Sequence, residues 1–415
     1  MSGGDFDVVV VGAGAAGIAA TRRLVDAGLD TMLVEARDRV GGRAWTIASP
    51  GGFPIDLGCG WLHSADRNVW REIAEARGFG IDRTPPPWSR PVLPRGSPGA
   101  EQKEFGEAIW KFRATLDEFP EGIPDRSAAS FLPPGGKWNP LLDAVSTFYS
   151  GAELARISVR DLARYDDTGV NWRVREGYGA LIAGHAAGLP LTLGCEVIRI
   201  DRSGQRVVIG TNTGRLTARA VLVTLSSNII AESEALFFPV LTEKVAAARN
   251  LPLGLADKLF LGLDGADEFH EESRAFGRMD RTATAGYHFR PFGLPEIEAY
   301  FGGSLAAELE AGGPDAFWDF AVAELTGIFG SAFAARLHRL GEHRWGQDPF
   351  ARGSYSYAVP GHADDRAALT APVDDRIFFA GEATSRADYS TAHGAHLSGV
   401  RAADEAIAIL TRQAT

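Results

Sequence analysis

The hydrophobic pattern near the start of the chain predicts a parallel β-α-β unit. Valine dominates residues 6–11, as is typical of a strand that is buried on both faces. A glycine-rich turn follows, and strong helix formers then fill residues 15–27 up to Gly28, a residue type that commonly ends helices. A second apolar strand is expected at Thr31–Val34. This order of elements predicts a Rossmann-like domain.

The rest of the chain predicts a second domain inserted into the first. Prolines make residues 81–100 an irregular excursion, and apolar strand and helix patterns then alternate up to the C-terminal region. Helices are expected near 101–119, 139–150, 314–329 and 396–410, and strands at 196–201, 206–211, 220–225, 258–263, 297–301 and 377–380. Because patterns of the nucleotide-binding type occur at both ends of the chain, we expect one domain to be assembled from separated segments.

Composition and charge narrow the class of protein. The 415 residues are 45% hydrophobic and 23% charged, which is typical of a globular protein with a large core. A net charge of −11 disfavours nucleic acid as a partner, and no apolar run reaches the ~18 residues of a membrane span. The start lacks a signal-peptide pattern, and Cys59 and Cys195 can form neither a disulfide framework nor a zinc site alone. We therefore expect a cytoplasmic protein without a metal.

A glycine-rich turn follows the first strand and fits the dinucleotide-binding pattern G-x-G-x-x-G. Gly12 permits the tight turn, Gly14 lets the backbone approach a pyrophosphate, and Gly17 lets the helix pack closely. The helix start, with Ala15 and Ala16, offers N–H groups to the anion. Glu35 ends the second strand, where a carboxylate accepts hydrogen bonds from a ribose diol. The motif predicts a dinucleotide but does not separate NAD from FAD.

Residues 37–44, with the sequence RDRVGGRA, make that distinction. Together with the upstream turn they resemble the glycine doublet of the flavin amine oxidase family. The resemblance implies FAD, with Gly42 and Arg43 against its pyrophosphate and with Ala36 and Arg37 as further cofactor contacts. The alternative is a surface turn with a solvated arginine.

Two later segments resemble the C-terminal FAD motifs of the same family. Residues 377–383 (IFFAGEA) would bring Gly381 and Glu382 to the cofactor. Residues 390–399 (STAHGAHLSG) resemble a stretch in which a helix start faces the flavin ring and stabilises negative charge there. In this chain that helix start comprises Thr391 and Ala392.

Other segments resemble polyamine oxidases and histone-demethylase-type amine oxidases. Residues 344–357 resemble their W…DP…GSYS segment, which implies that Trp345 packs on the flavin. Residues 56–63 resemble their D-x-G-x-x-W-x-H segment, which carries a substrate-side histidine, here His63. The resemblance also implies cofactor contacts from Gly58, Gly60, Trp61 and Val197.

The resemblance also nominates catalytic residues. Lys258 aligns with the lysine that holds a water against flavin N5 and assists the reaction with oxygen, whereas the pattern alone would allow a lysine reaching outward from a strand end. Tyr355 matches one of two substrate-framing tyrosines, and Thr391 stands at the other, so the aromatic cage is incomplete. Ser354 stands where monoamine oxidases attach FAD through a cysteine, which implies noncovalent FAD.

Several polar residues have two interpretations. His63 and His393 are expected either at the substrate pocket or in ordinary capping and packing roles. A solvated loop is the favoured interpretation of Asp166, Asp167 and Glu153, over attraction of a cationic substrate. Ser226–Ser227 replaces the usual proline-containing turn without an evident reason.

The combined prediction is an FAD-dependent amine oxidase that converts a C–N bond of a primary or secondary (poly)amine to an imine and reduces O2 to H2O2. Its expected partners are a small amine and O2, without nucleic acid or membrane, in a monomer or homodimer. Alternatives are a related FAD enzyme acting on a non-amine, such as a desaturase or isomerase, a nicotinamide dehydrogenase, and a noncatalytic flavin-binding module. The expected α/β fold has a Rossmann-like FAD-binding domain at 1–80, 188–255 and 345–415, and an inserted mixed-sheet and helical (α+β) substrate domain at 81–187 and 256–344.

Overall fold

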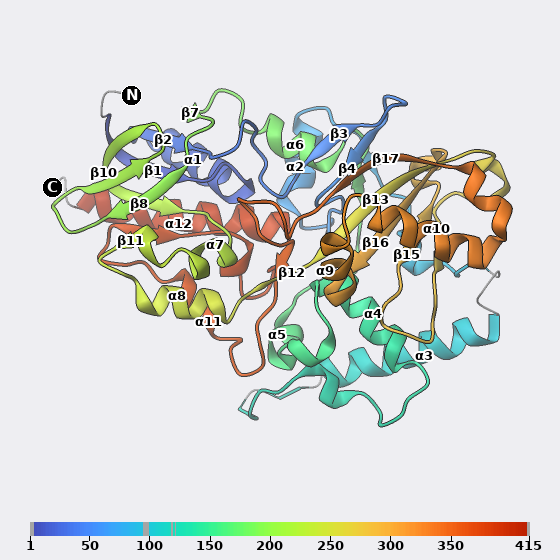
Figure 1. Cartoon of the computed structure of the whole chain (residues 1–415). Coiled ribbons are helices and arrows are strands. Elements are labelled where there is room, and N and C mark those ends of the chain that lie inside the picture. Colours follow the sequence, from blue (N-terminus) through green and yellow to red (C-terminus); the bar gives the residue numbers. More distant parts are fainter. Residues whose placement is uncertain (1–3, 94–98, 118, 121, 413–415) are drawn as a thin grey trace.

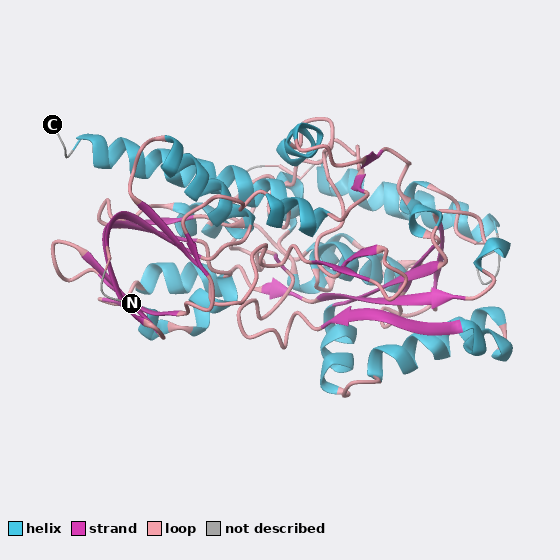
Figure 2. Cartoon of the chain, turned by 90° about the horizontal axis from the view of Figure 1, so that it is seen from above, coloured by secondary structure: helices cyan, strands magenta, loops and turns pink. Residues whose placement is uncertain are grey.

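Two β-sheets lie toward opposite ends of the molecule, and the chain passes between them several times (Figure 1). The computed structural model describes residues 4–93, 99–117, 119–120 and 122–412. Both ends of the described chain lie beside the first sheet, and helices cover both sheets (Figure 2). Within the described residues, no helix has the length and apolar composition needed to cross a membrane.

The first sheet has eight strands in the order β11-β8-β9-β10-β1-β2-β7, with β19 also paired to β10. Strands β2, β1, β10 and β19 are parallel, and their residues Leu33, Val10, Leu222 and Phe378 are successive partners across the sheet. The strands are β1 (Asp5–Val11), β2 (Thr31–Val34), β7 (Leu191–Thr192), β8 (Val197–Asp201), β9 (Val207–Thr211), β10 (Gly214–Val223), β11 (Phe237–Phe238) and β19 (Ile377–Phe379).

Both faces of this parallel region are buried, which explains the valine-rich run of β1. Val8 and Val10 face the helices α1 (Ala15–Asp26) and α12 (Ala392–Arg412), whereas Val9 and Val11 face the opposite layer. That layer contains α7 (Ser227–Glu232), α8 (Thr242–Arg249) and α11 (Asp365–Thr370). Alternating positions of one strand therefore serve two hydrophobic cores.

The second sheet is antiparallel throughout, in the order β14-β15-β16-β13-β17. Its strands are β13 (Ala256–Leu263), β14 (Ser273–Phe276), β15 (Gly286–Phe289), β16 (Glu296–Gly302) and β17 (Leu337–His343). One face is apolar and packs on α9 (Gly303–Ala311) and α10 (Ala316–Phe329), with Leu259, Ala299 and Tyr287 among its residues. The opposite face carries the polar alternate positions, which begin the functional site.

The remaining elements connect the two sheets. They are the helices α2 (Val69–Ala76), α3 (Gly99–Asp117), α4 (Asn139–Ser150), α5 (Val159–Arg164) and α6 (Tyr178–Gly184), and the strands β3 (Thr46–Ala48), β4 (Pro54–Asp56), β5 (Ile81–Asp82), β6 (Arg173–Val174), β12 (Leu253–Gly254) and β18 (Tyr355–Ser356).

Most of the expected elements are confirmed to within about two residues, and two begin at least four residues earlier than expected. The last helix begins at Ala392 rather than 396, because the Thr391 hydroxyl accepts a hydrogen bond from the Gly394 N–H and caps the first turn. The strand expected at 220–225 is the end of the longer β10, which pairs with the β-meander strand β9 as well as with β1. Residues 94–98 of the expected irregular excursion, and residue 118 at the end of an expected helix, lie outside the described residues.

Helices α1 and α12 cross so closely that one position must be glycine. A Cβ added at Gly399 of α12 would overlap the carbonyl oxygen of Ala16 in α1. By contrast, a Cβ added at Gly327 of α10 would meet no atom within 4 Å. The two glycines therefore provide a matched pair of helix positions, one constrained by packing and one free.

We expect Gly399→Ala to lower the free energy of unfolding by about 1–3 kcal/mol, because one of the two helices must move. Gly327→Ala is expected to leave it unchanged or to raise it by up to about 1 kcal/mol, since alanine is the better helix former. Chemical denaturation followed by circular dichroism measures both changes. Equal effects of the two substitutions would contradict the close α1–α12 contact.

Candidate functional site

A cavity of about 1000 Å³ is lined by the ends of the first sheet's strands and by the polar face of the second sheet. Almost all of the residues nominated from the sequence line it: Gly12, Gly14, Ala15, Ala16, Glu35, Ala36, Arg37, Gly42, Arg43, Gly58, Gly60, Trp61, His63, Val197, Lys258, Trp345, Tyr355, Gly381, Glu382, Thr391 and Ala392. Gly17 does not line it. A Cβ there would overlap the Gly12 carbonyl oxygen, so Gly17 lets α1 pack against the turn.

One end of the cavity is suited to an anion held by backbone N–H groups. Gly12 has a φ of +98°, and α1 then begins at Ala15 without a side-chain cap and without an acid in its first turn. The first N–H groups of a helix have no partner within the helix, and they carry a partial positive charge. A diphosphate fits such a helix start better than any neutral group does.

A second loop closes over this turn. Gly42 has a φ of +59°, and a Cβ at this position would lie 3.3 Å from the Gly14 Cα. Arg43 follows and lines the same cavity, and its Nη1 donates to the Ser354 carbonyl at 2.7 Å and to Glu382 Oε1 at 2.9 Å. The turn at Gly12 and Gly14, the start of α1, Gly42 and Arg43 form a cradle that combines backbone N–H donors with a fixed guanidinium.

Glu35 is held rigidly beside this cradle. Its Oε2 accepts from the Ala13 N–H at 2.8 Å, and its Oε1 accepts from the Arg37 N–H at 3.0 Å. The Arg37 guanidinium in turn pairs with Asp348 at 2.5 Å. Each Glu35 oxygen keeps a further lone pair, so the carboxylate can still accept hydrogen bonds from a sugar diol in the cavity.

Glu382 lies deeper and is stabilised as a carboxylate. Its Oε2 accepts from the Ser356 hydroxyl at 2.6 Å and from the Ser390 N–H at 3.0 Å. Burial by itself would raise the pKa of Glu382, but Arg43, the Ser356 hydroxyl and Arg366 outweigh burial and lower the pKa. The side chain therefore stays charged and cannot rotate freely.

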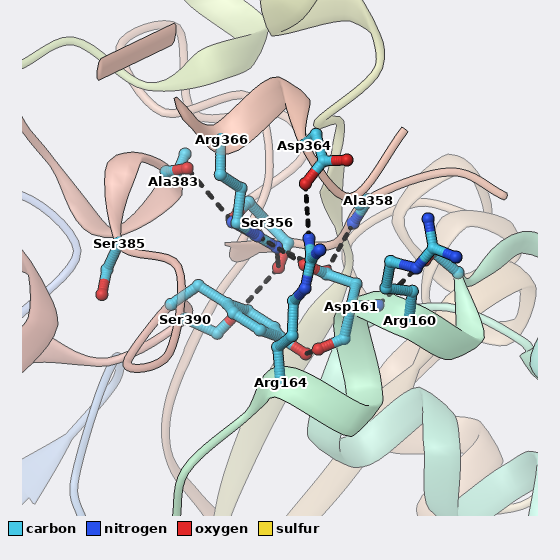
Figure 3. A network of polar contacts seen from close by, with 12 residues as sticks. Arg160, Asp161, Arg164, Ser356, Ala358, Asp364, Arg366, Ala383, Ser385 and Ser390 are labelled. Atoms are coloured by element: carbon cyan, nitrogen blue, oxygen red, sulfur yellow. Dashed lines mark hydrogen bonds and ion pairs between the residues drawn. The ribbon is translucent and has the colours of Figure 1, made fainter. Parts of the chain in front are cut away.

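Figure 3 shows a buried ion pair between Arg366 and Asp161, next to Ser356. Arg366 binds Asp161 through two contacts of 2.7 Å, with 1% of each side chain exposed. The same guanidinium donates to the Ser356 hydroxyl at 2.9 Å. Ser356 thus joins the pair to Glu382 and to the cavity wall.

The middle of the cavity holds a buried ammonium. Lys258 Nζ donates to the Asp56 carbonyl at 3.0 Å and pairs with Glu298 at 2.8 Å. It lies 3.4 Å from where a Cβ of Gly60 would be, and Trp345 lines the same region with its indole N–H bound to the Leu57 carbonyl. A lysine reaching outward to solvent is therefore excluded, because the Lys258 side chain is buried and lines the cavity.

A row of alternating charges leads away from Lys258 along the polar sheet face, and sequence reasoning missed it. Glu298 approaches His288 Nδ1 at 3.5 Å, His288 Nε2 lies 2.7 Å from Glu272, and Glu272 pairs with Arg173 at 2.5 Å. Burial lowers the pKa of His288, but the two glutamates more than compensate and raise it overall. Burial likewise opposes the Glu298 carboxylate, yet Lys258 and His288 lower its pKa.

Three nominated substrate-side residues have their polar atoms engaged. His63 Nδ1 lies 2.6 Å from the Asn171 amide oxygen, and burial lowers the pKa of His63, which favours the neutral ring. The Tyr355 hydroxyl donates to the Phe148 carbonyl, and the Thr391 hydroxyl donates to the Asp388 carbonyl at 2.6 Å. All three residues line the cavity.

Of the other polar residues singled out from the sequence, most lie outside the lining and Ser226 belongs to it. His393 packs between Asn68 and Asp388, as its packing interpretation predicts. Asp166, Asp167 and Glu153 are also absent from the lining. Ser226 lines the cavity, caps α7 by accepting from the Ile229 N–H, and donates to the Ala351 carbonyl, which accounts for its place after β10.

The far wall was not predicted in detail. It is built by α3, α4 and strands β14–β16, and includes Trp88, Arg90, Lys103, Phe105, Ile109, Arg113, Phe148, Tyr149, Arg274, Phe276, Tyr287, His288 and Tyr300. The sequence signal that could have revealed part of this wall is the alternation of polar residues at Glu296, Glu298 and Tyr300 in an otherwise apolar strand. Among the described residues, His, Cys, Asp and Glu form no group of three or more that could hold a metal.

The chain is similar to known proteins over nearly its whole length. The family model described as "Flavin containing amine oxidoreductase" matches residues 15–99 and 80–407. "Polyamine oxidase 3" of Oryza sativa subsp. japonica is 30% identical, covering 96% of this chain and 88% of its own. "Lysine-specific histone demethylase 2" of Homo sapiens is 25% identical and covers 96% of this chain but 53% of its own. A redesigned putrescine oxidase structure has a TM-score of 0.77 at 20% identity, covering 98% of this chain and 99% of that one, which confirms the expected fold.

The raised pKa of His288 predicts a pH dependence of stability. A histidine whose pKa rises on folding stabilises the fold below its ordinary pKa of about 6.5, and this contribution is lost as the pH rises through the folded value. We therefore expect the Tm advantage of the wild type over His288→Gln to shrink from pH 6 to pH 9. His338→Gln, at an exposed position of β17, is the control. An advantage that grows with pH would contradict the charged His288.

Proposed function

Because the chain belongs to the flavin containing amine oxidoreductase family, we propose that it is an FAD-dependent oxidase of small amines. It converts a C–N bond of a primary or secondary amine to an imine, and O2 is reduced to H2O2. The observation that carries the proposal is the buried Lys258 ammonium beside Gly60 and Trp345, in a cavity whose other end is shaped for a dinucleotide.

The residues present fit FAD. The α1 start and Arg43 would hold the pyrophosphate, Glu35 the ribose, and Trp345 with Gly58 the ring region. When bound, the flavin supplies a two-electron oxidation of the C–N bond and its own reoxidation by O2.

Noncovalent binding is supported by the side chains near the ring. The Ser354 hydroxyl donates to the Ala256 carbonyl and accepts from the Ala256 N–H, so no thiol occupies this position. Cys59 lines the cavity, but burial raises the pKa of its thiol to about 12 and keeps it protonated.

The protein's own part in the reaction is electrostatic. Glu298 and the Asp56 carbonyl fix the position of the Lys258 ammonium. This fixed cation would stabilise the negative charge that develops on oxygen as it is reduced. Burial lowers the pKa of His63, so its ring is neutral at neutral pH and does not repel a cationic substrate. The positive end of α12, begun by Thr391 and Ala392, faces the same cavity.

The purified protein is expected to be yellow and to release FAD into the filtrate after acid denaturation. Anaerobic mixing with an amine panel should bleach the flavin absorbance, and air should then restore it with one H2O2 per flavin. The panel should include diamines, alkylamines, amino acids and arylalkylamines. A colourless protein that takes up no FAD, or a flavin that no amine bleaches, would contradict the proposed activity.

Lys258→Met should retain FAD and slow the reoxidation of reduced flavin by O2 at least 10-fold, because a fixed charge of this kind contributes factors of about 10²–10³. Stopped-flow absorbance with reduced enzyme measures the rate directly. Lys137→Met is the matched control, since this exposed lysine binds Glu104 outside the cavity. Unchanged oxygen kinetics in Lys258→Met would remove the assigned role.

A further inference from the structure

The wall of the cavity farthest from the dinucleotide end is cationic. Four basic residues line it: Arg90, Lys103, Arg113 and Arg274. Among the described residues, the carboxylates that line the cavity are Glu35, Glu196 and Glu382. Glu35 and Glu382 belong to the cofactor cradle, and Glu196 directly precedes β8 of the first sheet. The far wall therefore has cations without a described carboxylate among its lining residues.

Sheet register places Arg274 on the same face as Lys258. Across the paired strands, Arg274 stands opposite His288, and His288 stands opposite Glu298. The neighbouring row on the same face, two residues along each strand, consists of Phe276, Gly286, Tyr300 and Lys258. Directly opposed residues of an antiparallel sheet share one face. The strand of Arg274 lies three strand spacings from that of Lys258, or about 14 Å. The cationic wall is thus remote from the expected reacting atoms.

None of the four cations forms an ion pair with a described carboxylate. Arg274 Nε donates to the Arg90 carbonyl at 3.2 Å, and Arg90 donates to the Glu271 carbonyl. The Arg113 guanidinium lies over the Tyr149 ring. Two acids of α3, Glu101 and Glu104, bind Lys137, and neither lines the cavity.

Two carboxylates of β16, Glu296 and Glu298, lie on the polar sheet face, and neither lines the cavity. Glu298 is bound by Lys258 and approached by His288, and Glu272 beyond it pairs with Arg173. The space between Lys258 and the four cations is bordered mainly by aromatic side chains: Trp88, Phe105, Phe148, Tyr149, Phe276 and Tyr300. A ligand that fits has an apolar body and an end that carries negative charge.

We propose that the substrate is an amine whose far end carries a carboxylate, and that Arg274 and its neighbouring cations select it over polyamines. The inference rests on the proposed amine oxidation. A polyamine that presents one amine near Lys258 would place another ammonium among Arg90, Lys103 and Arg274, where no described lining carboxylate compensates it. A carboxylate in the same place gains charge-assisted hydrogen bonds.

Substrates matched in length test the proposal. For chains of four, six and eight carbons, the panel compares the α,ω-diamine, the alkylamine and the ω-amino acid with the holoenzyme. We expect kcat/KM of the ω-amino acid to exceed that of the diamine at least 10-fold for the best length, with the alkylamine between them. Equal or better oxidation of diamines would overturn the proposal. A preference for tyrosine over tyramine without a preference for ω-amino acids would overturn the remote position of the carboxylate.

Variants separate a specific role of the wall from a general loss of structure. Arg274→Gln should raise KM for the ω-amino acid at least 10-fold and change kcat/KM for the alkylamine less than 3-fold. Lys103→Glu, at an exposed position, should shift the preference toward diamines without a risk to folding. Arg278→Gln is the matched control, because this exposed arginine pairs with Asp280 outside the cavity. Loss of the preference in Arg278→Gln as well would contradict a local effect.

A binding measurement distinguishes failure of this inference from failure of the proposed activity. Tryptophan fluorescence of the holoenzyme, with Trp61 and Trp88 in the cavity wall, is titrated with hexanoate, hexylamine and 1,6-diaminohexane. Tighter binding of hexanoate that Arg274→Gln abolishes supports the anion site even if no amine bleaches the flavin. Tighter binding of the diamine overturns the anion site, whereas the proposed activity is then judged by flavin bleaching alone.

Discussion

The bidentate ion pair between Arg366 and Asp161 is the interaction on which the cavity wall depends. Two charges in an interior cost free energy unless every donor and acceptor is satisfied. Here the guanidinium also donates to Ser356 and to the Ala383 carbonyl and lies 3.8 Å from the centre of the Tyr389 ring. Arg366 and its partners come from α11, α5, β18 and the segment after β19, so this one ion pair holds four stretches of chain together. Ser356 also donates to Glu382, which fixes the position of Glu382 relative to the ion pair.

The same constraint organises the second sheet. One face of β13, β15 and β16 is apolar and supports α9 and α10, and the other carries ionisable side chains that are buried and must compensate one another. The row from Lys258 to Arg173 meets this condition by alternating its charges. At the far wall the half-buried Arg90 and Arg274 donate to backbone carbonyls rather than to carboxylates, which is the physical basis for assigning them to a ligand.

The cofactor end was predictable because its motifs are local. The turn with Gly12 and Gly14, the doublet before Arg43 and the segment around Glu382 each fit within one strand, turn or helix start, so contiguous residues carry the signal. The far wall was not predictable in the same way. Arg274 comes onto the same sheet face as His288 and Lys258 only through the pairing of four strands. Phe148 contacts Tyr355 through a backbone carbonyl, which no side-chain pattern encodes.

The order of the parallel strands β2, β1, β10 and β19 has a consequence for biosynthesis. Val10 and Leu222 are 212 residues apart in the sequence, and Leu222 and Phe378 are 156 residues apart. Strand β10 therefore lacks its β19 partner, and α1 lacks α12, until the C-terminal segments have left the ribosome. Contacts of such sequence separation form slowly and leave apolar surface uncovered in the meantime. Capture of a cofactor would therefore be one of the last events in the maturation of the protein, because Glu382 and the start of α12 belong to the segment that is made last.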